Sequence, residues 1–161
     1  MFEPEIKAWK TGSNKEVEFS TISEQILIHS LKNKKIFIGS DSFISQNKTC
    51  FVTAVCLLTK NLGGRYFFYR ERVPTKYHRS LPLRITEEVR RSIEVAEHFI
   101  QKFNVKPTQI ELHLDVSPPA SKNGTSRFSE MLKGYVQGFG LTCKLKPDAW
   151  ASQSVADRHS K

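Results

Sequence analysis

The chain alternates between continuous apolar runs and segments in which apolar residues recur every three or four positions. The runs, some with strict alternation, predict strands at 36–42, 49–59, 65–73, 109–116 and 141–145. A periodicity of about 100° per residue predicts helices at 21–31, 81–103 and 127–137, and Asp148 is expected to begin a last, short helix. Residues 1–20 show neither pattern and are expected to form a loosely held polar arm.

This order of elements predicts an α/β fold. Three consecutive strands with short connectors, one of them at 61–64, form an antiparallel meander. The strands at 36–42 and 109–116 are separated by the long helix, and such a crossover joins parallel neighbours in one sheet. We therefore expect a mixed five-stranded sheet flanked by helices, in a single domain spanning 1–161 whose arm and first helix (1–34) precede the core.

Two of the predicted strands carry an acid to their ends. The run IFIGSDS places Asp41 after an apolar strand, and IELHLDVS does the same with Asp115, ahead of two prolines that cannot continue a ladder. Either acid alone is explained as a turn former. Together they meet at neighbouring carboxyl ends, where open α/β sheets bind ligands. Adjacent carboxylates repel, so we expect a cation between them, and oxygen-only ligands favour Mg²⁺ or Mn²⁺.

Composition narrows the class of protein. No apolar run approaches the roughly 20 residues that a membrane helix requires, and the N-terminus has acids where a signal peptide is apolar, so we expect a cytoplasmic protein with no membrane partner. Three cysteines without CxxC spacing support neither a disulfide framework nor a zinc site. The formal charge of +9 favours nucleic acid as partner, although basic proteins also bind acidic membranes or other proteins.

The succession of strand, acid, meander, helix with acid, strand, acid and C-terminal helix with acid resembles the ribonuclease H-like superfamily. Within it, the chain looks most like the YkuK-type family of predicted nucleases. The motifs that carry the resemblance are IGSDS at 38–42, TEE at 86–88, HLDVSP at 113–118 and KPDAWASQSVADRHSK at 146–161. The resemblance implies metal-dependent cleavage of a phosphodiester by a carboxylate cluster, in which Asp41 and Asp115 match the acids of strands one and four.

Two further acids are assigned to the cluster. Glu88 lies about 80° from the centre of the apolar face of the long helix and Glu87 nearly opposite that face, so Glu88 is chosen. Glu87 is explained by the helix macrodipole, which favours acids near an N-terminus. Asp157 resembles the C-terminal helix acid of the superfamily. Asp148 has a simpler explanation as a helix N-cap and is the reserve candidate.

Two histidines, His159 and His113, each have two possible roles. His159 either moves protons or meets the scissile phosphate, or it lies exposed in the tail. His113 shares a strand face with Glu111 and Asp115, because side chains alternate along a strand. That polar face either lines the site, or Glu111 is exposed at the start of the strand and His113 is a hydrogen-bonded interior group.

The nucleic acid is expected to be RNA, DNA or a hybrid. Candidate phosphate contacts are Lys122, Arg127, Lys144 and Lys146, and the amides of residues 123–126 at a helix start serve the same purpose. A solvated loop is the alternative for each. The aromatic residues 67–69 are expected in the core rather than as a base-stacking platform.

The mechanism expected from this set uses two Mg²⁺ or Mn²⁺ ions about 4 Å apart, with Asp41 bridging them. One ion activates water and the other stabilises the leaving oxygen. The alternative is a binding module with the same fold and basic surface but no competent metal site. A third possibility is a structural subunit of a larger assembly, which would have an exposed apolar patch.

Overall fold

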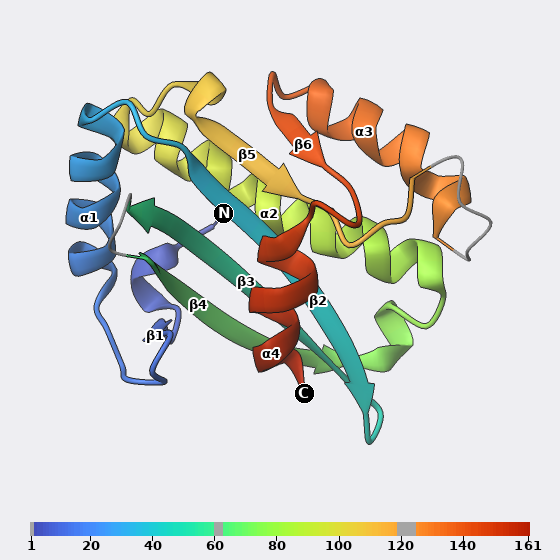
Figure 1. The fold of residues 1–161 in the computed structure, drawn as a ribbon. Helices are drawn as coiled ribbons and strands as arrows, with labels where there is room; N and C mark the ends of the chain where they lie inside the picture. Colours follow the sequence, from blue (N-terminus) through green and yellow to red (C-terminus); the bar gives the residue numbers. More distant parts are fainter. Residues whose placement is uncertain (1, 60–62, 119–124) are drawn as a thin grey trace.

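The computed structural model describes residues 2–59, 63–118 and 125–161. Within these ranges a mixed sheet has the strand order β1-β4-β3-β2-β5-β6 (Figure 1). The strands are β1 (Lys10–Thr11), β2 (Ile36–Ser45), β3 (Lys48–Thr59), β4 (Gly63–Pro74), β5 (Ile110–His113) and β6 (Thr142–Lys144). β2, β3 and β4 are antiparallel, whereas β2, β5 and β6 run parallel. The predicted meander, crossover and fold class are confirmed.

The N-terminal arm is more ordered than the sequence suggested. β1 pairs with β4 and adds a sixth strand to the expected five. The side chain of Trp9 is almost fully buried, with its ring centroid 4.7 Å from that of Tyr69, and its indole N–H donates to the carbonyl of Pro4. A strand of two residues is too short to show a period, so this element was missed.

The helices cover both faces of the sheet (Figure 1). They are α1 (Phe19–Leu31), α2 (Leu81–Phe103), α3 (Ser129–Gln137), the π-helix Ala151–Ala156 and α4 (Asp157–Ser160), which continues it. α2 has the predicted bounds: its buried residues run from Ile85 to Phe99, and Asn104 ends it with a left-handed backbone. None of the helices in the described ranges has the length and apolar character that crossing a membrane demands.

The C-terminal helix lies directly on the backbone of β2. Side chains of β2 alternate between the two faces: Ser40 hydrogen-bonds Ser92 of α2, whereas Phe37 packs against Trp150 on the other face. At Gly39 the π-helix comes so close that a Cβ atom would lie 2.5 Å from the amide nitrogen of Ser152. Glycine at this position therefore lets the C-terminal helix reach the centre of the sheet.

We predict that Gly39→Ala destabilises the protein by about 2 kcal/mol, because the backbone of the π-helix has to move away from the new methyl group. The free energy of unfolding, measured in urea, checks this. Gly134→Ala is the matched control: it lies in α3 with open space around the added methyl, and alanine is the better helix former by about 1 kcal/mol. Equal effects of the two substitutions would contradict the packing argument.

Candidate metal centre

Asp41 and Asp115 come together through the register of two parallel strands. The last pair between β2 and β5 is Gly39 with His113, and each acid lies two residues beyond it. Asp41 was expected at the end of its strand but lies inside β2, because pairing with β3 holds β2 extended as far as Ser45. Only the parallel pairing ends before Asp41. The two strands part there, and both carboxylates occupy the opening.

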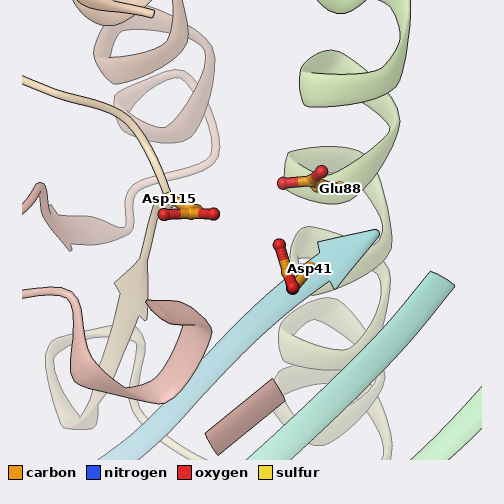
Figure 2. Close-up of side chains that lie close together, drawn as sticks. All are labelled: Asp41, Glu88 and Asp115. Carbon is orange, nitrogen blue, oxygen red and sulfur yellow. The ribbon is translucent and has the colours of Figure 1, made fainter. Parts of the chain in front are cut away.

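Glu88 completes the group from the helix side. It projects from α2 toward both aspartates (Figure 2), and one carboxylate oxygen from each of the three residues lies within 4.8 Å of the others. Asp41 and Glu88 are buried, and Asp115 is partly exposed. The structure thus gathers acids from a strand, a helix and a strand-end loop, 74 residues apart at their extremes, at the carboxyl ends of the parallel strands.

Each carboxylate has one cationic or hydroxyl partner. The hydroxyl of Ser42 donates to Oε2 of Glu88 at 2.6 Å, and the hydroxyl of Ser160 donates to Oδ2 of Asp41 at 3.0 Å. Nζ of Lys146 lies 2.8 Å from Oδ1 of Asp115. One ammonium among three acids leaves an excess of negative charge in a buried place.

The electrostatics of the group show this excess. Burial, and then the charge of Asp115, raises the pKa of Asp41 from 3.8 to about 7, against the hydrogen bond from Ser160. Burial and the charge of Asp41 raise the pKa of Glu88 well above its usual value. Without a cation, Asp41 holds a proton up to about neutral pH, and the pKa of Glu88 is raised in the same direction. An all-oxygen, anionic donor set with this property fits a hard divalent cation such as Mg²⁺ or Mn²⁺.

The proposed fourth acid does not join the group. Asp157, at the start of α4, is paired with Lys161 at 3.0 Å and is about two-fifths exposed. Its charge is among the causes that raise the pKa of Asp41, after burial and Asp115. Asp148, the reserve candidate, is exposed, and the helix that it was expected to cap begins later, at Ala151.

Ser160 is the contact that sequence reasoning missed. It is 3% exposed, and its one hydroxyl hydrogen is shared between Oδ2 of Asp41 at 3.0 Å and the carbonyl oxygen of Asp157 at 3.1 Å. A serine near a chain end carries no signal by itself. The buried small residues Ser152, Ala156 and Ser160 recur every four positions, however, and this spacing marks the face of the C-terminal helix that lies on the sheet.

Both candidate histidines are held in place by contacts with neighbouring residues. Nε2 of His159 lies 2.8 Å from the hydroxyl of Tyr66, and its ring stacks on Phe68 at 3.8 Å, so it is neither exposed nor in the carboxylate group. His113 is an interior group with both nitrogens bonded. Its Nδ1 accepts from the amide of Ala151, so Nε2 carries the hydrogen and donates to Glu111.

The predicted phosphate-contact residues lie in different parts of the structure. Lys146 lies at the site through Asp115, and Lys144 is exposed on β6. Arg127 covers the ring of Phe128 at 4.8 Å. Lys122 and residues 123–124 lie outside the described residues, as do residues 61–62 of the predicted connector. The aromatic residues 67–69 are buried, as expected.

We predict that Asp41 makes the metal-free protein less stable as pH rises. Its pKa is raised on folding, so the folded state binds the proton more tightly, and the free energy of unfolding falls by up to about 4 kcal/mol from about pH 4 to about pH 7. Urea unfolding in EDTA measures this. Buried histidines titrate in the opposite sense, so the difference between wild type and Asp41→Asn isolates the effect. A wild-type profile parallel to that of Asp41→Asn would contradict the prediction.

Comparison with known proteins agrees with this geometry. The family model described as "Ribonuclease H-like" matches residues 18–161. The "Uncharacterized protein YkuK" of Bacillus subtilis (strain 168) is 25% identical over 166 residues, which cover 92% of this chain and 94% of that protein. No solved structure matches the chain significantly. Since the family model covers most of the chain, including all three acids of the group, the chain belongs to the ribonuclease H-like family.

Proposed function

We propose that this protein is a metal-dependent nuclease that hydrolyses phosphodiester bonds in nucleic acid. The observation that carries the proposal is the convergence of Asp41, Glu88 and Asp115 within 4.8 Å in a buried place where their charges need a cation. The family includes many nucleases, and the formal charge of +9 suits a polyanionic substrate. A protein that only bound nucleic acid would have no use for acids buried beside one another.

The three acids would hold the Mg²⁺ or Mn²⁺ ions. When bound, such ions supply a water of lowered pKa and stabilise charge on the phosphate oxygens. The hydroxyls of Ser42 and Ser160 fix the orientation of Glu88 and Asp41. Burial keeps bulk water from screening the charges of the group.

Lys146 is a cation already at the site. Its ammonium neutralises part of the charge of Asp115 and, being about two-fifths exposed, is placed to contact a phosphate of the substrate. Asp157 adds negative charge from the edge of the group, as an outer acid rather than a fourth member. A proton-transfer role for His159 stays a prediction; its Nε2 is hydrogen-bonded to the hydroxyl of Tyr66.

We predict that Glu88→Gln lowers the cleavage rate at least about 100-fold, because a neutral amide is a poor ligand for a divalent cation. Asp41→Asn should have the same effect. The measurement is cleavage of end-labelled RNA, DNA and hybrid substrates with Mn²⁺ or Mg²⁺. Glu87→Gln is the matched control, one residue away on the same helix, where Glu87 pairs with the exposed Arg90 and the buried Arg91 and lies outside the carboxylate group. Activity that survives Glu88→Gln but not Glu87→Gln would reverse the assignment.

Metal binding separates the nuclease from a binding module that lacks a competent site. Titration with Mn²⁺ should raise the melting temperature of the wild type in a saturable way, and Asp41→Asn or Asp115→Asn should abolish this. The apparent affinity should increase with pH up to about 7 and then level off, because protons on Asp41 compete with the metal below that pH. Saturable binding that is indifferent to both substitutions, or no binding at all, would support the binding module.

A further inference from the structure

A groove lies next to the carboxylate group on the sheet face that carries the C-terminal helix. Its volume is about 310 Å³, and Phe43, Lys48, Arg72, Ser160 and Lys161 are among the residues that line it. Ser160 belongs both to this groove and to the site, because its hydroxyl donates to Asp41. Ser160 therefore links the groove to Asp41.

The strand register places the lining residues on one face. Phe43 follows Asp41 by two positions, about 7 Å along β2, and so points to the same side. Phe43 pairs with Cys50 of β3, which pairs in turn with Arg72 of β4. α4 ends at Ser160, and the β2–β3 hairpin continues beyond it (Figure 1). Among the described residues, the sheet face past Ser160 forms the groove.

The groove combines an exposed aromatic ring with two exposed cationic side chains. Phe43 is 41% exposed, and its ring contacts no other ring in the described part of the chain. Lys48 and Arg72 are exposed and form no ion pair or side-chain hydrogen bond with another described residue. Arg90 and Arg91, by contrast, are both paired with glutamates. Unpaired cations beside an uncovered aromatic ring match a ligand that has both phosphates and flat rings.

We propose that this groove binds a single-stranded segment of the nucleic-acid substrate, with a base stacked on Phe43 and phosphates on Lys48 and Arg72. The inference rests on the proposed function and specifies its substrate. Bases in a duplex are stacked on one another, so an aromatic ring at the floor of a groove meets the face of a base only where the strand is unpaired. Lys161 contributes less, because Asp157 already neutralises it.

The test measures binding in EDTA, where no metal-dependent cleavage occurs. The probes are a fluorescent single-stranded oligonucleotide, the same sequence as a blunt duplex, and a single strand with an abasic site at each position in turn. We expect the wild type to prefer the single strand. Phe43→Ala should weaken binding about tenfold, and the loss should shrink on the abasic strand that removes the stacked base. Arg72→Gln should weaken binding to all sequences and lower the salt slope by about one.

Two matched control substitutions remove similar side chains from the opposite face of the sheet. Ile44 is also exposed on the β2–β3 hairpin and points to the opposite side, so Ile44→Ala should change binding less than twofold. Arg65 is an exposed arginine of β4 on the other face, and Arg65→Gln removes the same charge as Arg72→Gln. Circular dichroism confirms that each variant is folded.

The inference is overturned if the duplex binds as tightly as the single strand, if Phe43→Ala and Ile44→Ala have equal effects, or if polyglutamate competes as well as the oligonucleotide. The last result would mean a docking surface for acidic protein segments. These outcomes are independent of cleavage. A nuclease that fails this test cuts a substrate held elsewhere, whereas a protein that passes it without cutting is a single-strand binder.

Discussion

The mutual repulsion of three carboxylates, two of them buried, is the constraint around which this protein is organised. Asp41 and Glu88 are buried and Asp115 lies partly exposed beside them, so their charges are weakly screened and the pKa values of Asp41 and Glu88 are raised. Such an arrangement destabilises a folded chain unless something positive binds there. Strain of this kind gathers at functional sites, since random drift would replace buried acids with apolar residues. The fold must therefore hold the three acids together against their own charge.

The fold does so by the simplest available means. Parallel pairing of β2 with β5 sets the relative height of the two aspartates, and continued pairing of β2 with β3 keeps Asp41 on a rigid strand after β5 has ended. α2 crosses beneath and supplies Glu88, and its position is fixed by an apolar face that runs the length of the helix. The C-terminal helix, which packs on Gly39, brings the hydroxyl of Ser160 to Asp41. All of these elements also pack in the core. The packing that stabilises the fold therefore also holds the site together.

The net charge of the whole chain and the local charge at the site have opposite signs. The chain as a whole is strongly basic, yet the group of side chains at the candidate metal centre is acidic. A polyanion is attracted to the protein from a distance by the net charge, and close to the acids it is repelled unless cations stand between. Lys146 on Asp115 and the basic groove beyond Ser160 lie at the boundary between these two regions. Attraction by the surface and dependence on a cation at the centre together suit a substrate that carries phosphates.

The sequence by itself determined the elements with a strong period and the residues that depend on them. The bounds of α2, the meander and the crossover follow from local apolar patterns, and the choice of Glu88 over Glu87 follows from the face of one helix. Only the tertiary structure decided what depends on distant contacts: the pairing of the two-residue β1, the position of Asp41 inside β2, the burial of Ser160 and the stacking of His159 on Phe68. The physical reason is that periodicity reports which side of an element is buried, whereas which atoms meet across elements is set by packing and register between segments far apart in the chain.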